Sequence, residues 1–195
     1  VPSGVSLAPG GGLTLTGALV VDGGTVKLDG NYPTGSNNVA LGDTALDSVE
    51  AGAERNVAIG DKAGTAITTG NNNTAIGTEA LKSNTTALNN TAIGYASLCT
   101  NSTGAGNTAV GQSALCANTT ASNNTAVGIE SLDANTTGAS NTALGKGSLS
   151  ANTTASNNTS VGFNSLTSNT TGPSNTAVGK DALLNNTVGD QNTAI

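Results

Sequence analysis

Small apolar and polar residues alternate with a strict period over most of the chain. The segment Asn-Thr-Ala-aliphatic-Gly recurs, with a first step of 18 residues and later steps of 17. Its Thr-Ala-aliphatic part predicts a short β-strand, because β-branched residues favour strands. The recurring glycines are Gly42, Gly60, Gly77, Gly94, Gly111, Gly128, Gly145, Gly162 and Gly179. Such a period is typical of a solenoid, in which each unit forms one coil.

Two apolar columns of the repeat are predicted to form the core. The residue before each glycine is always aliphatic, so we expect it to point inward, together with the β-branched residue two positions earlier. Ala and Gly would then face outward and leave a nearly bare backbone surface. The first core column contains Ile76, Ile93, Val110, Val127, Leu144, Val161 and Val178, and the second contains Leu81, Leu98, Leu115, Leu132, Leu149 and Leu166.

An asparagine opens every unit. Asn tolerates turn and left-handed backbone geometry, and stacked side-chain amides can form a hydrogen-bonded ladder. We therefore predict a structural ladder along the rod. It contains Asn73, Asn90, Asn107, Asn124, Asn141, Asn158 and Asn175.

The repeat predicts an all-β fold, a parallel β-solenoid or β-roll of about nine 17-residue coils over residues 38–195, with the last repeat truncated. Helix is disfavoured because the unit is rich in Gly, Asn and Thr, and collagen is excluded because Gly does not recur every third residue. Coils rising about 4.8 Å each would make a rod roughly 45 Å long. Residues 1–37 lack the repeat and predict a capping or neck segment with short, irregular β-strands.

A core with two sizeable aliphatic residues per coil buries little apolar surface against the cost of ordering 17 residues. Association through the Ala and Gly face would add burial. We therefore expect a homo-oligomer, a trimer first of all, and a lone solenoid is the alternative.

Composition excludes several classes of function. Thr, Gly, Asn and Ser make up just over half of the 195 residues, His is absent, and only 9% of residues are charged. The net charge of −6 argues against nucleic acid, and no apolar run is long enough for membrane insertion. We predict no enzyme, no metal and no cofactor. The acidic residues Asp43, Asp47, Glu50, Glu54 and Asp61 indicate a solvated cap, with a metal site as the minor alternative.

Cys99 and Cys116 are 17 residues apart and so fall in one column of adjacent coils. Stacked Cα atoms about 4.8 Å apart would lie within disulfide range. A bridge between coils and two free thiols both remain open. The Asn-x-Thr sequons at Asn84, Asn118, Asn135, Asn152 and Asn169 are interpreted as by-products of turn chemistry.

The unit Asn107-Thr108-Ala109-Val110-Gly111 resembles the head repeats of YadA-type trimeric autotransporter adhesins. Units of this kind with Asn-Thr-Thr are also similar to repeats in tail-fibre-like proteins of phages and large viruses. The resemblance covers residues 38–195 and implies a left-handed parallel β-roll with three chains around an axis.

The leading functional hypothesis is a structural fibre segment, a rigid extracellular or virion appendage that projects a receptor-binding tip. Its partners would be copies of itself and, through a region outside this chain, a cell-surface receptor. The alternative is a bacterial surface adhesin head that binds host or matrix. A minor alternative is an ice-binding solenoid, in which alternation would turn one Thr per coil outward.

Overall fold

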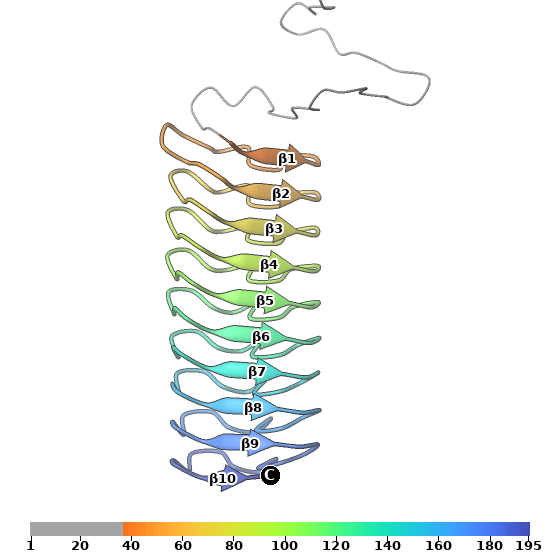
Figure 1. The fold of residues 1–195 in the computed structure, drawn as a ribbon, viewed down its shortest axis with the longest axis vertical. Helices are drawn as coiled ribbons and strands as arrows, with labels where there is room; N and C mark the ends of the chain where they lie inside the picture. The colour runs from red at the N-terminus through yellow and green to blue at the C-terminus, as the bar shows by residue number, and fades with distance from the viewer. Residues whose placement is uncertain (1–36) are drawn as a thin grey trace, which may run out of the picture.

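The computed structural model describes residues 37–195, which form one continuous stack of coils (Figure 1). Each coil contributes one short strand to a ten-stranded, all-parallel sheet whose strand order follows the sequence. There is no helix among the described residues. The strands are β1 Val39–Leu41, β2 Val57–Ile59, β3 Thr74–Ile76, β4 Thr91–Ile93, β5 Thr108–Val110, β6 Thr125–Val127, β7 Thr142–Leu144, β8 Thr159–Val161, β9 Thr176–Val178 and β10 Thr193–Ala194.

The stacking register is the register of the repeat. Thr108 pairs with Thr125, Ala109 with Ala126 and Val110 with Val127, so like columns lie on top of one another. The predicted parallel β-solenoid of about nine coils is therefore confirmed. The strands predicted within residues 1–37 lie outside the described residues.

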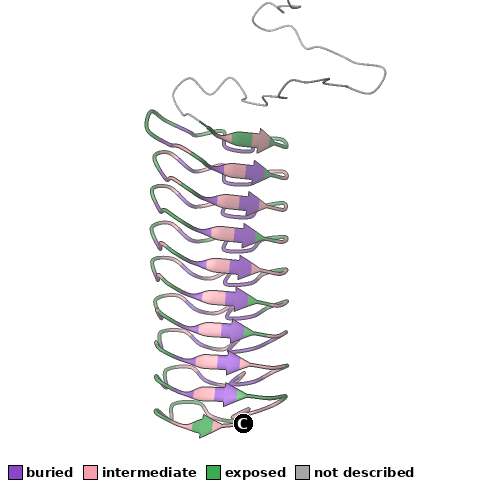
Figure 2. Cartoon of the chain, in the orientation of Figure 1, coloured by how far each residue is buried: buried purple, intermediate pink, exposed green. Residues whose placement is uncertain are grey.

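The side of each strand that faces the core is opposite to the prediction. The central Ala of the strand is fully buried, as at Ala92, Ala109 and Ala126, whereas Ile93 is 37% exposed (Figure 2). The predicted inward orientation of the aliphatic column is therefore wrong, and the bare Ala surface does not exist. The residues that turn out to be half-exposed or exposed are Ile76, Ile93, Val110, Val127, Leu144, Val161 and Val178.

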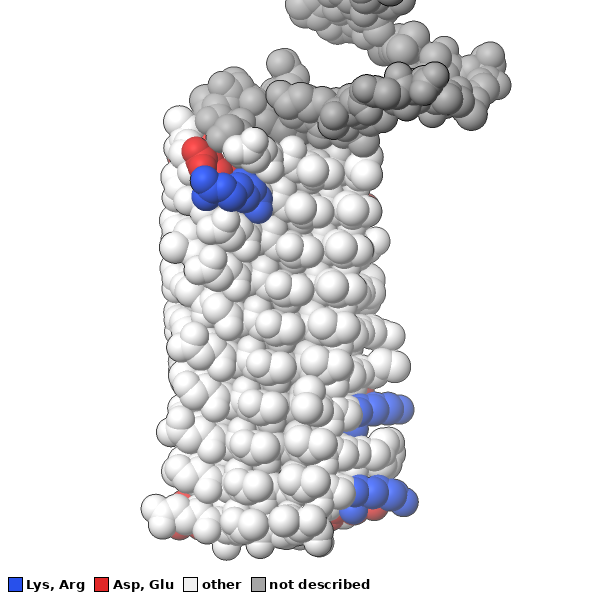
Figure 3. Space-filling model, viewed as in Figure 1, with Lys and Arg blue, Asp and Glu red and all other residues white. Residues whose placement is uncertain are grey.

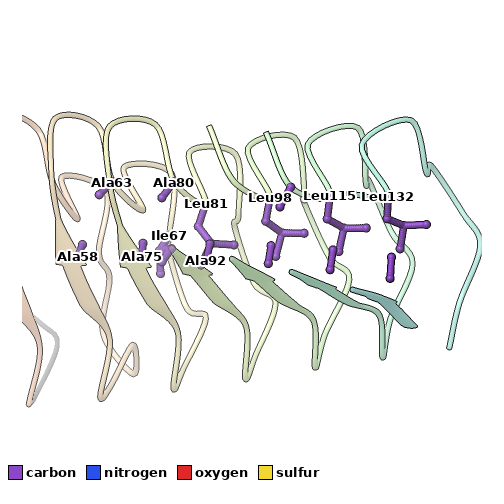
Figure 4. Close-up of a cluster of buried hydrophobic side chains, with 14 of the residues drawn as sticks. Ala58, Ala63, Ile67, Ala75, Ala80, Leu81, Ala92, Leu98, Leu115 and Leu132 are labelled. Carbon is purple, nitrogen blue, oxygen red and sulfur yellow. The ribbon is translucent and has the colours of Figure 1, made fainter. Parts of the chain in front are cut away.

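The leucine column is confirmed as core. Leu81, Leu98 and Leu115 are fully buried, and Figure 4 shows them in a row along the stack beside the strand alanines. Leu132, Leu149 and Leu166 are equally buried. Leucines from one wall of the coil and alanine methyl groups from the strand fill the narrow interior together. The larger aliphatic residue of each strand therefore points outward. The apolar pattern by itself does not indicate this orientation.

One coil departs from the leucine column and compensates locally. Gly64 occupies the leucine position, and a Cβ atom there would lie 3.0 Å from Ile67 Cδ1 and 3.1 Å from Leu46 Cδ2. Ile67 is buried at a position where later coils have an asparagine such as Asn84. The isoleucine thus supplies the apolar volume that Gly64 lacks.

The repeat glycines from Gly42 to Gly162 are required by the neighbouring coil. Gly111 has a φ of 133°, and a Cβ atom on it would lie 2.5 Å from the carbonyl oxygen of Gly128. Neither the backbone angle nor the space accepts another residue. A glycine therefore recurs in these coils because adjacent coils approach closely at this position, and not because the surface there is open.

A second set of backbone hydrogen bonds joins the coils on the leucine side. The amide of Leu98 donates to the carbonyl of Ala114 at 3.0 Å, and that of Leu115 donates to Ser131 at 3.0 Å. Leu98 and Leu115 have φ values of 50° and 53°, in the left-handed region. This wall is therefore hydrogen-bonded like a sheet without having strand geometry.

Candidate functional site

The predicted asparagine ladder exists, and it is built mainly from bonds between side chains and backbone, with amide-to-amide bonds such as Asn73 Nδ2 to Asn56 Oδ1 at 3.1 Å near its ends. Asn107 Oδ1 accepts the backbone N–H of Asn124 at 3.0 Å, and Asn107 Nδ2 donates to the carbonyl of Ala121 at 2.9 Å. The side chain thus bridges its own coil to the next one. Members of this buried column are Asn73, Asn90, Asn107, Asn124, Asn141, Asn158 and Asn175.

The left-handed conformation expected at these asparagines falls on the preceding residue instead. Asn89 and Asn123 have φ values of 59° and 62°, whereas Asn90 and Asn124 do not have positive φ. The invariant asparagine is therefore selected for its two hydrogen bonds. Within the described residues, Asn158 Nδ2 is the buried side-chain polar atom that has no hydrogen-bond partner.

A second asparagine column was not recognised from the sequence. Asn118 Nδ2 donates to Asn101 Oδ1 at 2.8 Å and to the carbonyl of Ala121 at 3.0 Å. The same contacts join Asn135 to Asn118 at 3.1 Å and Asn152 to Asn135 at 2.8 Å. The signal was available, since these asparagines also recur every 17 residues in Asn-Thr-Thr.

This second ladder changes the interpretation of the sequons. Asn84, Asn118, Asn135, Asn152 and Asn169 are fully buried, and their amides are engaged. Their Asn-Thr-Thr sequence serves the ladder rather than only the turn. A glycan on any of these side chains is incompatible with the folded stack, because the amide nitrogen has no path to solvent.

A buried serine in the strand column shows how the core accepts a hydroxyl. Ser160 replaces the usual alanine and is fully buried. Its Oγ donates to the carbonyl of Ser165 at 2.8 Å and accepts from Ser148 Oγ at 2.7 Å. The polar group is thus satisfied, which removes the penalty of burying it unpaired.

Cys99 and Cys116 lie side by side in adjacent coils as half-buried free thiols. Their Sγ atoms are 2.6 Å apart. The hydrogen bond from Cys99 lowers the pKa of Cys116 to about 7, and the same contact raises the pKa of Cys99 well above its usual range. Either sulfur can be the donor in this contact, so the pair can share one proton while the other sulfur is a thiolate.

The outer face of the sheet is an uncharged stripe of threonine and aliphatic side chains. No strand from β1 to β10 contains a charged residue. Figure 3 shows the surface over the strands almost free of charge, with charged groups near the first coils and beyond the C-terminal ends of some strands. Ile59, Ile93 and Val127 are each at least 36% exposed on this face.

Some of the charged groups elsewhere in the described residues form short-range surface pairs. Lys82 Nζ lies 3.1 Å from Glu79 Oε1, and Arg55 lies 3.2 Å from Glu54. Such exposed pairs contribute little to stability. Burial raises the pKa of Asp133, one coil beyond Cys116. No group of three or more His, Cys, Asp or Glu side chains within residues 37–195 could hold a metal ion.

Comparison with known proteins finds no matching family model, no similar curated protein and no similar solved structure. The fold and the ladders define the class of the described segment, which is a repeat protein of the parallel β-solenoid type. Residues 37–195 contain no helix that is long and apolar enough to cross a bilayer.

Proposed function

We propose that this chain is a non-enzymatic structural fibre segment, a rigid homotrimeric spacer in a virion or cell-surface appendage. The observation that carries the proposal is the outer face of the ten-stranded sheet. It presents an uninterrupted stripe of aliphatic and threonine side chains with no charge in any strand. Exposed aliphatic residues that recur along one continuous face favour an interaction surface there.

The subunit interface is assigned to this face, not to the Ala and Gly surface that the apolar pattern indicated. Ten strands about 4.8 Å apart, all but β10 three residues wide, present about 430 Å², close to half of the ~800 Å² per partner in a typical stable interface. Neighbouring exposed residues must therefore contribute. Tyr95, Ile129 and Phe163 follow the repeat glycines directly and are exposed at the edge of the stripe.

Mechanical rigidity would come from the continuous ladders. Each coil is joined to the next by strand pairing, by the backbone bonds of the leucine side and by two asparagine columns. Bending or stretching the rod would break several buried hydrogen bonds at once, each of which is costly to leave unmade. Such a rod suits a spacer that holds a receptor-binding tip, carried outside this chain, away from a particle or cell.

The test is the mass and shape of the full chain in solution, by light scattering and electron microscopy. A trimeric rod is expected, and Val127→Glu should convert it to monomers that keep the β circular dichroism signal. Thr120→Glu is the matched control, because Thr120 is exposed outside the strands and should leave the trimer intact. A wild-type chain that stays monomeric at all concentrations would refute the trimer.

Ice binding is the second candidate, because the structure turns a column of threonines outward on a flat sheet. The strands stack with little rotation in Figure 1, and Thr108, Thr125 and Thr142 lie in register. Hydroxyl and methyl groups repeating every ~4.8 Å can order water. This activity requires the face to be free, so it excludes the trimer. Thermal hysteresis that is lost in Thr125→Lys would support it.

A further inference from the structure

The two cysteines occupy a geometry that is ready to form a covalent bond. Cys99 and Cys116 have the same place in adjacent coils, and their Sγ atoms are in contact at 2.6 Å. Hydrogen bonds hold the backbone on both sides: Ser83 N–H donates to Cys99 O at 3.1 Å, and Thr100 N–H donates to Cys116 O at 3.2 Å. Rungs about 4.8 Å apart satisfy the Cα separation of a disulfide, so no backbone movement is needed.

We propose that Cys99 and Cys116 are a reversible modification site, at which a small-molecule disulfide of the glutathione class converts the two thiols into a bond between neighbouring coils. This inference is independent of the proposed fibre function. Both side chains are half-buried rather than enclosed, so a small disulfide can reach them. The chain contains two cysteines, so any competing product would carry an adduct or join two chains.

The contact between the sulfurs sets the order of the steps. Either sulfur can be the donor in this contact; with Cys99 as the donor, the pKa of Cys116 falls to about 7 and Cys99 stays protonated. The Cys116 thiolate attacks the small disulfide, forms a mixed disulfide and releases one small thiolate. The Cys99 sulfur then attacks the Cys116 sulfur, releases the second small molecule, and its proton leaves with that thiol. Two electrons pass from the two cysteines to the small disulfide, which becomes two thiols.

The product is a local staple rather than a change of fold. It joins the coils that contain β4 and β5, near the middle of the described stack. These coils are already hydrogen-bonded to each other on both walls, as by Leu98 N–H to Ala114 O at 3.0 Å. The bond therefore acts mainly on states in which the two coils separate, because closing a loop restricts the unfolded chain.

The experiment equilibrates the full chain with oxidised glutathione and measures its intact mass and peptide map without reductant. The expected product is a monomer mass lower by two hydrogen atoms, with Cys99 linked to Cys116, and dithiothreitol should restore the starting mass. Cys99→Ala should stop at a stable glutathione adduct on Cys116. A wild-type chain that keeps two adducts, or that does not react, would overturn the proposal.

A matched pair of cysteines tests whether the coil spacing matters. Cys116→Ser combined with Asp133→Cys places the two thiols two coils apart, about 9.6 Å, beyond disulfide range. This variant should end as mixed disulfides, and an internal bridge in it would contradict the geometry. In the wild type, exchange of the Leu98 amide, which donates to Ala114 across the stapled pair of coils, should slow by roughly 100-fold on oxidation. An unchanged exchange rate would show that the bond does not staple the stack.

Discussion

Asn124 Oδ1 accepts the backbone N–H of Asn141 at 2.9 Å, one coil further along the chain. The same side chain donates from Nδ2 to the carbonyl of Gly138 at 2.9 Å. One buried amide therefore pairs with a backbone N–H and a backbone carbonyl that are not hydrogen-bonded by the strands. The contact recurs in coil after coil. The cost of burying the amides and the stabilisation from their hydrogen bonds therefore both increase with the number of coils.

Replacing this amide should destabilise the stack strongly. Asn124→Ala leaves the Asn141 N–H buried without a partner and removes one of the two amide donors to the Gly138 carbonyl, which keeps Asn135 Nδ2. We expect a loss of roughly 1–3 kcal/mol of unfolding free energy. Urea denaturation followed by circular dichroism measures it. Asn123→Gly is the control: Asn123 is exposed with a φ of 62°, which glycine accepts, so its midpoint should hardly move. Equal midpoints for the two variants would argue against the ladder.

Two glycines of the same column should respond differently to alanine. Gly128 has a φ of 136°, and a Cβ atom there would lie 2.5 Å from Gly145 O, whereas Gly179, with a φ of 127°, has nothing within 4 Å. Gly179→Ala should therefore cost only the backbone strain, about 1–2 kcal/mol. Gly128→Ala adds overpacking of about 1–3 kcal/mol. Thermal denaturation should show the larger loss of stability for Gly128→Ala. The reverse order would contradict the close approach of adjacent coils at this glycine.

Inside and outside of the coil can be distinguished by a pair of apolar substitutions. Leu115 is fully buried, so Leu115→Ala should lose about 2–5 kcal/mol of unfolding free energy. Val127 is 36% exposed, so Val127→Thr keeps the shape of the side chain and should cost less than ~1 kcal/mol in the dissociated chain. Chemical denaturation at a protein concentration low enough for monomers measures both. A large loss of unfolding free energy for Val127→Thr would contradict the outward orientation of Val127.

Alkylation of the thiols should depend on pH through Cys116. The thiolate is the nucleophile, so the rate at Cys116 should rise with pH, with a midpoint at about 7, because the hydrogen bond from Cys99 lowers its pKa. Cys99→Ala removes that donor and should move the midpoint up towards the ordinary value of 9.0. Iodoacetamide kinetics with peptide mapping give the profile. A midpoint that stays in place in Cys99→Ala would exclude the hydrogen bond as the cause.

Sequence periodicity predicted the coil, the stacking register and the buried leucines. Leu98 and Leu115 recur every 17 residues with no polar substitute between them, and only burial in equivalent coils explains such a column. The spacing of Cys99 and Cys116 likewise predicted that their sulfurs would be neighbours. These features depend on the repeat alone, because in a solenoid equal steps along the chain become equal steps along the axis.

Periodicity could not decide which side of the strand faces inward. Ala109 and Val110 are adjacent, both are apolar, and the larger residue is the ordinary choice for a core. The choice depends on the opposite wall, where Leu115 with a φ of 53° already fills the interior and leaves room for a methyl group only. The second asparagine ladder was missed for a related reason, since Asn118 in Asn-Thr-Thr has the composition of an exposed turn.

The sequence by itself thus determined a parallel stack of like columns, its number of coils and its buried leucines, because these follow from a regular repeat. Only the tertiary structure decided that Ala109 points inward and Val110 outward, and that Asn118 is buried, because each depends on how much space the facing wall of the coil leaves. That space is set by side chains from a different part of the unit, and local alternation contains no information about it.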